Sequence, residues 1–391
     1  MARLVLHRGR AKPAWFGHPW VYSQAVQRVE GDAAPGGVVD VCDHDGRLVG
    51  RGFYNPRSQI ACRLLSWRAD EPLDTRWLVG RLASAHLTRK GLGLPGATTD
   101  AYRLVNSEGD GLPGLIVDVY GDVLAVQFTA LGMKLREAEV CDALQEILEP
   151  RAIAETTGAA FAEAEGFSAV SRPLRGEIAG PVHCVEDGLR LAVDLFDGQK
   201  TGLYLDQRES RAWVGTRSRG ARVLDLYCYA GGFAMQAARG GATSVTAVDI
   251  SPRALGRAAA NAALNGLDFD RVEADAFRFL EAAAPGSYDL VVLDPPKFAR
   301  GRRDLDAALK GYRKLNALGM SACADRALLL TCCCSQLVSL EEFERAIAAA
   351  AKDTGRRVRV LRVASQPPDH PVPPAFPEGR YLKVLLLEIS R

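Results

Sequence analysis

The segment from Arg222 to Gly232 constrains the fold more than any other part of this sequence. Its apolar run over 223–226 predicts a buried strand, two adjacent glycines end that strand, and a helical pattern follows over 233–239. A strand, a tight turn and a helix in this order let backbone N–H groups approach a ligand at the edge of a parallel sheet. Strands and helices alternate from there onward, which predicts an α/β fold with a doubly wound, Rossmann-like sheet.

Acidic residues follow four consecutive predicted strands, at Asp225, Asp249, Asp275 and Asp294. Ligands of doubly wound sheets bind beyond the carboxyl ends of the strands, so these side chains are candidates for one site. A single acid in such a place could instead cap a helix, but a set of four makes that reading weak.

The turn from Asp225 to Gly232, DLYCYAGG, indicates the class of cofactor. It lacks the G-x-G-x-x-G spacing of dinucleotide-binding turns. A carboxylate ahead of the glycines would repel a pyrophosphate but can hold an ammonium group, and a charge inside a strand is costly unless it binds something. The turn therefore favours S-adenosylmethionine, whose methionyl end carries an amine, over NAD. Asp249 is placed to accept both ribose hydroxyls, and Asp275 and Phe277 could bracket an adenine.

The fourth strand end, DPPKF at 294–298, is the most specific motif. Its two prolines fix the backbone and remove two donors, which leaves carbonyl groups free to face a substrate. Asp294 can accept a hydrogen bond from a base edge or, when protonated, donate one.

Three consecutive cysteines, Cys332, Cys333 and Cys334, follow the fifth strand, which we expect over 327–331. Carbon-5 of a pyrimidine is a poor nucleophile, but a thiolate that adds to carbon-6 makes an enamine whose carbon-5 can attack a methyl sulfonium. Lys297 or a helix N-terminus could lower the pKa of such a thiol. The residues alone leave open which thiol acts, and two or all of them could be small buried hydrophobes. Methylation of an exocyclic nitrogen would need no thiol.

Composition narrows the class of protein. The chain has 391 residues, a net charge of +2 and nine cysteines. It shows neither a membrane-spanning apolar run nor a signal-peptide region, so we expect reduced thiols in the cytoplasm. No Cys/His spacing suggests a metal. An RNA partner would have to meet local basic patches, such as the one formed by Arg3, Arg8, Arg10 and Lys12.

Three domains are expected, at 1–72, 74–178 and 181–391. The first is β-rich, with strands over 38–42, 48–53 and 60–65 and the aromatics Trp20 and Tyr22, which either contact RNA or fill a small barrel core. The second is an α+β module with a strand meander over 102–130 and a helix over 131–148. The third is the doubly wound domain, in which we expect a helix over 303–323.

A resemblance covers essentially the whole chain. The chain carries seven motifs together: KTGLYLDQR at 200–208, DLYCYAGGF, DPPKF, GYRKLN at 311–316, the pair Cys334-Ser335, DHPV at 369–372 and PEGRYLK at 377–383. In these motifs the chain resembles the bacterial class I large-subunit rRNA (cytosine-5-)-methyltransferases of the RlmI type. The first domain is similar to a PUA RNA-binding module, and the second to the α+β domain inserted in that family.

The resemblance implies a role for each cofactor residue. Asp225 holds the methionine part, Asp249 takes the ribose, and Asp275 takes the adenine edge. The turn contributes Tyr229, Ala230, Gly231 and Gly232. Ala276 and Phe277 lie beside Asp275 at the adenine, and Ile250 follows Asp249 at the ribose. The segment that would close over the cofactor contains Lys200, Thr201, Gly202, Tyr204 and Gln207.

On the substrate side, the resemblance implies that Asp294, Pro295 and Pro296 hold the cytosine, with Lys297 and Phe298 beside them, and that Cys334 is the nucleophile. Many related RNA enzymes carry a second cysteine after the motif's proline, whereas Lys297 stands there in this sequence. The group that removes the carbon-5 proton is therefore unassigned. The implied partner is 23S rRNA or a large-subunit precursor, and a homodimer is left open.

Two alternatives remain at this point. One keeps S-adenosylmethionine but methylates guanine or an exocyclic nitrogen, using Asp294-Pro-Pro with Phe298 stacked on the base. The other is a non-catalytic RNA-binding assembly factor.

Overall fold

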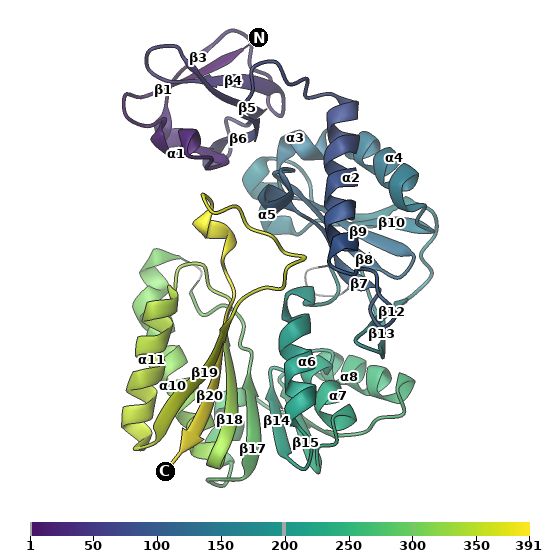
Figure 1. The fold of residues 1–391 in the computed structure, drawn as a ribbon, viewed down its shortest axis with the longest axis vertical. Helices are drawn as coiled ribbons and strands as arrows, with labels where there is room; N and C mark the ends of the chain where they lie inside the picture. Colours follow the sequence, from purple (N-terminus) through teal and green to yellow (C-terminus); the bar gives the residue numbers. More distant parts are fainter. Residues whose placement is uncertain (1, 198–200, 300) are drawn as a thin grey trace. The chain divides into compact units, whose positions relative to one another are not determined.

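The computed structural model of the protein describes residues 2–197, 201–299 and 301–391. Its contacts divide the chain into two compact units. Unit 1 comprises Met1–Glu186, Val193–Leu205 and Pro368–Gly379, and unit 2 comprises Asp187–Ala192, Asp206–Pro367 and Arg380–Arg391. Unit 1 contains two sheets, each with its own core, and unit 2 contains one large sheet (Figure 1). The expected division into three successive domains stays a prediction.

The first sheet of unit 1 has six strands in the order β2-β6-β5-β4-β1-β3. Their bounds are β1 (Arg3–Leu6), β2 (Trp20–Tyr22), β3 (Val26–Glu30), β4 (Val38–Cys42), β5 (Leu48–Tyr54) and β6 (Ile60–Ser66), with the short helices α1 (Lys12–Trp15) and η1 (Ser23–Ala25) between them. Alternating apolar residues such as Leu4, Val41 and Leu64 form its core. The three strands expected here are confirmed.

The second sheet of unit 1 has five strands in the order β11-β10-β9-β8-β7. Its strands are β7 (Ala101–Asn106), β8 (Leu115–Tyr120), β9 (Val123–Phe128), β10 (Ala152–Thr156) and β11 (Ser171–Arg175), and its helices are α2 (Thr75–Gly91), η2 (Ser107–Asp110), α3 (Leu131–Lys134), α4 (Glu137–Leu148) and α5 (Ala159–Glu165). The meander is confirmed. The single helix expected over 131–148 is wrong, because the chain breaks it before Glu137: Lys134 turns to the buried Glu155, 2.8 Å away, and Arg136 lies over the Phe53 ring.

The strands β12 (Val182–Glu186) and β13 (Leu189–Val193) form a two-stranded sheet. Unit 2 then contains a seven-stranded sheet in the order β16-β15-β14-β17-β18-β20-β19. Its strands are β14 (Arg222–Leu226), β15 (Ser244–Asp249), β16 (Asp270–Glu273), β17 (Tyr288–Leu293), β18 (Cys323–Cys333), β19 (Arg357–Ala364) and β20 (Lys383–Ser390). The first five run parallel, and β20 is antiparallel to both of its neighbours.

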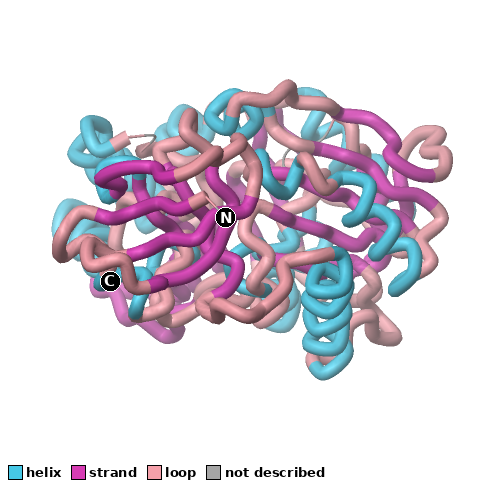
Figure 2. Tube along the Cα trace, turned by 90° about the horizontal axis from the view of Figure 1, so that it is seen from above, coloured by secondary structure: helices cyan, strands magenta, loops and turns pink. Residues whose placement is uncertain are grey.

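Helices cover this sheet as the alternating pattern predicts (Figures 1 and 2). They are α6 (Arg208–Arg217), α7 (Gly232–Arg239), α8 (Pro252–Leu264), α9 (Ala276–Ala282), α10 (Leu305–Ala322) and α11 (Leu340–Thr354). The short helices η3 (Leu205–Gln207), η4 (Arg302–Asp304) and η5 (Pro377–Gly379) lie in connecting segments, and η5 belongs to unit 1. Residues of α9, α10 and α11, such as Leu280, Tyr312 and Phe343, pack with the strands in one buried core. Within the described residues no helix is long and apolar enough to cross a membrane.

Strand β18 is longer than the sequence pattern predicts. It begins at Cys323, where Cys323 pairs with Tyr288 of β17, so the preceding helix ends at Ala322 and not at 323. It continues past the expected end at 331, because Cys332 and Cys333 pair with Val384 and Lys383 of β20. The sheet therefore holds two of the three consecutive cysteines, and the third follows its end.

Candidate functional site

The carboxyl ends of five adjacent strands meet at one edge of the seven-stranded sheet. Strands β16, β15, β14, β17 and β18 are neighbours in this order and pair in parallel. The residues at or just after these ends are, in spatial order, Asp275, Asp249, Asp225, Asp294 and Cys334. The structure thus gathers the four acids and a thiol along one edge.

Asp225 is the buried acid of this edge. Its side chain has no exposed area, and its Oδ2 accepts a hydrogen bond from the backbone N–H of Ala234, 3.0 Å away in the first turn of α7. The other oxygen, Oδ1, is buried without a hydrogen-bond partner. Burial raises the pKa of Asp225 to about 8, and the nearby Asp294 and Asp249 add to the rise. A buried carboxylate oxygen without a donor is suited to receive one from a bound cation.

The turn that follows Asp225 is strained. Tyr227 and Tyr229 adopt positive φ angles of 62° and 49°, which non-glycine residues rarely do, and Gly231 has φ 79°. A Cβ atom on Gly231 would lie 2.9 Å from the Cβ of Ala258, so the position has no room for a side chain. Strain of this kind persists only where the surroundings enforce it, and it clusters at ligand-binding turns.

Asp249 organises the next strand end. Its Oδ2 accepts from the backbone N–H of Tyr229 at 3.0 Å and its Oδ1 from that of Ser251 at 2.9 Å. Each oxygen keeps a second lone pair for a ligand. The neighbouring Ile250 leaves 68% of its surface exposed, which is unusual for isoleucine and makes it available to pack against an apolar ring.

At the third strand end the acid caps a helix, the interpretation that the sequence pattern made weak for the set of four. Oδ1 of Asp275 accepts from the backbone N–H of Arg278 at 3.0 Å and caps α9. Ala276 is buried, while the half-buried Phe277 ring lies 6.4 Å from the Phe298 ring. Asp275 is thus a helix cap whose second oxygen is not used by that cap.

The fourth and fifth strand ends are in contact. The Cys334 thiol donates to the backbone oxygen of Pro295, with a sulfur–oxygen distance of 3.7 Å. Cys334 and Asp294 are half-buried, whereas Pro296 and Lys297 are exposed. The Phe298 ring packs on Tyr312, with ring centroids 4.7 Å apart. The proline motif and the third cysteine therefore form one wall of the site.

The other two cysteines of the triplet are in the core. Cys332 and Cys333 have no exposed area, and Nε2 of Gln207 donates to the Cys332 sulfur at 3.3 Å. Burial, with the charge of Asp294, raises the pKa of the Cys332 thiol well above its ordinary value. All nine cysteines lie in described parts of the chain as free thiols, and Cys334 alone among them is not fully buried.

The C-terminal motif PEGRYLK supplies two contacts that the sequence did not predict. The Tyr381 hydroxyl donates to Oδ2 of Asp206 at 2.5 Å, and Nζ of Lys383 donates to the backbone oxygen of Ser335 at 2.6 Å. The available signal was a lysine inside the apolar run of the last strand, where a charge needs a specific partner.

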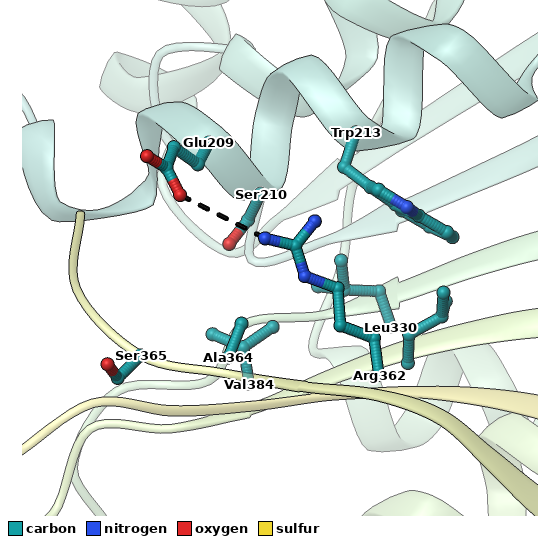
Figure 3. Close-up of a pocket in the computed structure, with 9 residues that line it drawn as sticks. Glu209, Ser210, Trp213, Leu330, Arg362, Ala364, Ser365 and Val384 are labelled. Atoms are coloured by element: carbon teal, nitrogen blue, oxygen red, sulfur yellow. Dashed lines mark ion pairs between the residues drawn. The ribbon is translucent and has the colours of Figure 1, made fainter. Parts of the chain in front are cut away.

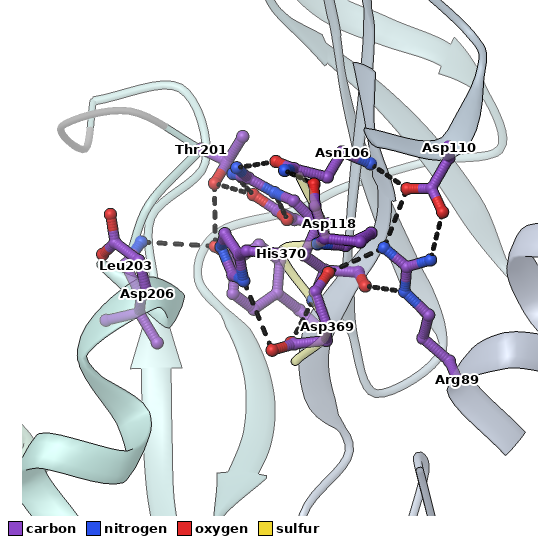
Figure 4. A network of polar contacts seen from close by, with 12 residues as sticks. Arg89, Asn106, Asp110, Asp118, Thr201, Leu203, Asp206, Asp369 and His370 are labelled. Carbon is purple, nitrogen blue, oxygen red and sulfur yellow. Dashed lines mark hydrogen bonds and ion pairs between the residues drawn. The ribbon is translucent and has the colours of Figure 1, made fainter. Parts of the chain in front are cut away.

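Thr201, from the segment expected to cover the cofactor, lies in a polar network of unit 1 (Figure 4). The Thr201 hydroxyl donates to Asp118 at 2.6 Å and lies 3.0 Å from the Tyr120 hydroxyl, which also accepts from the backbone N–H of Leu203. Gly202 has φ 125°, and a Cβ there would lie 2.3 Å from Val193. The side chain of Thr201 is therefore committed to protein partners.

The rest of this network is ionic and fixes a second segment of unit 1. Arg103 forms a two-point ion pair with Asp118, and the fully buried Arg89 forms one with Asp110 while donating to the backbone oxygen of Asp369. Of the remaining residues in the expected covering segment, Tyr204 is half-buried and Gln207 is buried. Lys200 lies outside the described residues.

The aromatic residues in and around the first sheet differ in their exposure. Trp20 donates from Nε1 to Glu108 at 2.7 Å and packs on Phe376, so it is engaged inside unit 1. Trp15, Phe16 and Trp67 are instead exposed by 54%, 73% and 42%. Trp67 donates to the backbone oxygen of Ala14 in α1, which brings its ring beside that helix. The sequence signal that could have indicated these three residues is their place next to the basic residues Lys12 and Arg68.

Unit 2 also has a small pocket (Figure 3). It lies between α6, Leu330 of β18, the end of β19 and the start of β20, and is lined by Trp213, Leu330, Val384 and neighbouring side chains. Arg362 extends across it towards Glu209, with 4.0 Å between the charged atoms. Its walls contain none of the strand-end acids.

Comparison with known proteins agrees with this geometry. The sequence pattern of the S-adenosylmethionine-dependent methyltransferase family matches residues 133–376, and that of a PUA-like domain matches 4–67. Proteins named ribosomal RNA large subunit methyltransferase I are 38% identical in Erwinia tasmaniensis (over 97% of this chain and 98% of the relative) and 39% identical in Shewanella amazonensis (over 99% of both).

Among solved structures, SMU.776 complexed with SAH superposes with a TM-score of 0.86 at 23% identity, covering 99% of this chain and 100% of that one, a likeness of fold. The expected fold class and the expected cofactor, S-adenosylmethionine, are confirmed. The unpartnered oxygen of Asp225, the tight glycine turn and the exposed Ile250 fit that cofactor. The chain therefore belongs to the S-adenosylmethionine-dependent methyltransferase family, together with the ribosomal RNA large subunit methyltransferases I, and carries a PUA-like domain.

Proposed function

We propose that this protein methylates carbon-5 of a cytidine in large-subunit rRNA, with Cys334 as the covalent nucleophile. The observation that carries the proposal is the contact between the Cys334 thiol, after β18, and the Pro295 carbonyl, after β17. Strand β17 is the neighbour of β14, which contains the buried Asp225. This contact supports the proposal because it brings the thiol next to the motif that we expect to hold the base. The substrate class follows from the names of relatives that match this chain over almost its whole length.

The cofactor half of the site lies on β14 and β15. Oδ1 of Asp225 would accept a hydrogen bond from the methionyl ammonium, and the backbone around Gly231 would approach the methionine chain. The remaining lone pairs of Asp249 would accept from the ribose hydroxyls, and Ile250 would cover one face of the adenine. When bound, S-adenosylmethionine supplies an electrophilic methyl group on a sulfonium.

The substrate half lies on β17 and β18. The Cys334 thiolate adds to carbon-6 of the cytosine, and the carbon–sulfur bond that forms moves electron density to carbon-5. Asp294, when protonated, donates to N3 and so stabilises the charge that develops on the ring. Carbon-5 takes the methyl group, and loss of its proton with expulsion of the thiolate restores the ring. Carbon-6 cannot be attacked within a base stack, so the target cytidine must be unstacked or flipped out.

Burial supports Cys334 as the nucleophile among the three neighbouring thiols. The nucleophile must touch carbon-6, which the fully buried Cys332 and Cys333 cannot do without opening the end of β18. Cys332 is also engaged by Gln207, and its raised pKa keeps it protonated. Cys334 has the exposure that the reaction requires.

An exposed aromatic patch in the PUA-like domain supports an RNA substrate. Trp15, Phe16 and Trp67 form this patch, and Arg10 and Lys12 are exposed next to it in sequence. Unstacked bases of single-stranded RNA stack on such rings, while basic side chains bind the phosphates.

Trapping with 5-fluorocytidine RNA tests the covalent step. Fluorine at carbon-5 cannot leave as a proton does, so the cysteine–cytosine adduct accumulates after methyl transfer and survives a denaturing gel. We expect the adduct with the unmodified protein and with Cys323→Ala, which removes a buried thiol at the other end of the same strand. We expect none with Cys334→Ala. An adduct that persists in Cys334→Ala, or methyl transfer to RNA without any adduct in the unmodified protein, would refute the mechanism.

A further inference from the structure

Lys383 is a buried lysine that the reaction described above does not use. It is the first residue of β20 and pairs with Cys333 of β18, so it stands beside the end of the strand that carries the nucleophile. Only 8% of its surface is exposed. A lysine this deeply buried is rare unless its ammonium has a specific task or partner.

The ammonium of Lys383 is directed at the chain segment that follows Cys334. Nζ donates a hydrogen bond of 2.6 Å to the backbone oxygen of Ser335. Ser335 is itself buried and donates from its hydroxyl to the backbone oxygen of Ala299 at 3.3 Å. The residue next to the nucleophile is therefore held from two sides, by β20 and by the loop after β17.

Four ionisable groups face the Lys383 ammonium from the elements around it. They are Cys333 and Cys334 at the end of β18, Glu342 in the first turn of α11, and Lys297 after β17. Burial lowers the pKa of Lys383, while the two thiols and Glu342 act in the opposite direction. Glu342 already caps α11, since its Oε2 accepts from both the N–H and the hydroxyl of Ser339 at 2.7 Å.

Cys334, once its thiol loses the proton, is the remaining anion that suits this ammonium; Cys332 of β18 and Tyr312 of α10 also face the Cys334 thiol. Cys333 is fully buried on the strand, whereas Cys334 is the half-buried group that the reaction needs in ionised form. A nearby cation lowers the pKa of a thiol because it stabilises the thiolate. Lys297, the lysine that the sequence suggested for this task, is exposed and therefore better screened by water.

We infer that Lys383 is a positioning residue for the methyl transfer: it fixes the Cys334–Ser335 segment through the Ser335 carbonyl, and its ammonium favours the thiolate of Cys334. The inference rests on the proposed role of Cys334 as nucleophile. Because it concerns the ionisation of a thiol, it can be measured without RNA or cofactor.

The test is the pH dependence of iodoacetamide alkylation at Cys334 in the native protein, read by mass spectrometry between about pH 5.5 and 9.5. The eight other cysteines are buried, and Cys334→Ala provides the blank. We expect the unmodified protein to show a midpoint below the ordinary thiol value of about 8.5. Lys383→Gln keeps a donor for the Ser335 carbonyl but removes the charge, and should raise the midpoint by about one pH unit.

Two further variants separate charge from structure. Lys383→Arg keeps the cation and should retain the low midpoint, and Lys297→Gln should leave the midpoint where it is. A midpoint in Lys383→Gln equal to that of the unmodified protein would overturn the inference, as would an unmodified midpoint at or above the ordinary thiol value. The second criterion holds even if the variants fail to fold. If the low midpoint and its dependence on Lys383 are found but the product is not 5-methylcytidine, the proposed function fails and the link between Lys383 and Cys334 stands.

Discussion

Replacing Asp225 by asparagine should make the cofactor-free protein more stable and weaken its cofactor binding. Asp225 is fully buried, one of its oxygens accepts from Ala234, and the other has no partner. Asparagine keeps an oxygen for Ala234 and carries no charge. The residue therefore contributes a penalty to the folded state, which we expect a bound cation, the methionyl ammonium, to relieve.

The magnitude follows from the pKa of about 8 that Asp225 has in the folded chain, against the ordinary value of 3.8 that an aspartate has in an unfolded chain. Because the folded pKa is the higher one, the folded state binds the proton more tightly. The contribution of Asp225 to stability is then most favourable below about pH 4 and is lost as the pH rises towards 8. Between these limits Asp225 should remove about 1.4 kcal/mol of unfolding free energy per pH unit.

The measurement is urea unfolding of the cofactor-free protein at pH 5, 6 and 7. The difference in unfolding free energy between Asp225→Asn and the unmodified protein should grow by about 3 kcal/mol over this range. Asp289→Asn is the matched control on β17: Arg222 lowers the pKa of Asp289, so it is ionised throughout the range in both states. A difference that stays constant with pH would refute the reasoning.

The same variant should lose affinity for S-adenosylmethionine. Removing one partner of a buried ion pair costs about 3–5 kcal/mol, which corresponds to a loss of at least about 100-fold in affinity. Calorimetric titration measures it, and unchanged affinity would show that the amine is held elsewhere.

Two further predictions concern the turn and the aromatic patch. Gly231→Ala forces a side chain into a left-handed position 2.9 Å from Ala258. We therefore expect a loss of roughly 1–2 kcal/mol in unfolding free energy and weaker cofactor binding. A variant as stable as the original would contradict the account. The double change Trp15→Ala and Phe16→Ala should weaken binding of single-stranded RNA by about 1–3 kcal/mol for each base that loses its stacking partner, at constant salt and with the thermal midpoint unchanged. Phe161→Ala, which removes another exposed aromatic of unit 1, should leave RNA affinity unaltered; equal losses in both would argue against a specific patch.

The sequence predicted the sheet of unit 2 well because local signals and global fold agree there. Buried strands, the glycine turn after Asp225 and the proline at the start of α8 all have short-range causes. The strand-end acids could be listed as one site, since parallel strands place their carboxyl ends on one edge.

What the sequence missed depends on partners distant in the chain. The ends of β18 are set by pairing with β17 and β20, and this pairing decides that Cys332 and Cys333 are buried and Cys334 is not. The break before α4 has a similar cause, since Lys134 is drawn to Glu155. No local pattern encodes such contacts.

The same limit applies to side chains that are polar but committed to the fold. The sequence left Trp20 open between an RNA contact and the core, and only the folded chain shows that Glu108 and Phe376 engage it. The resemblance implies a cofactor contact for Thr201, and only the folded chain shows that its hydroxyl donates to Asp118. Lys383 is the converse case, a residue without an assigned role whose partner appears only in the folded chain.

The most direct test of the central claim is methyl transfer from labelled S-adenosylmethionine to large-subunit rRNA, with identification of the product nucleoside, for the unmodified protein, Cys334→Ala and Cys323→Ala side by side. The account predicts 5-methylcytidine from the unmodified protein and from Cys323→Ala, and no labelled nucleoside from Cys334→Ala. A methylated guanosine or an N-methylated base as the product, or 5-methylcytidine formed by Cys334→Ala, would contradict it.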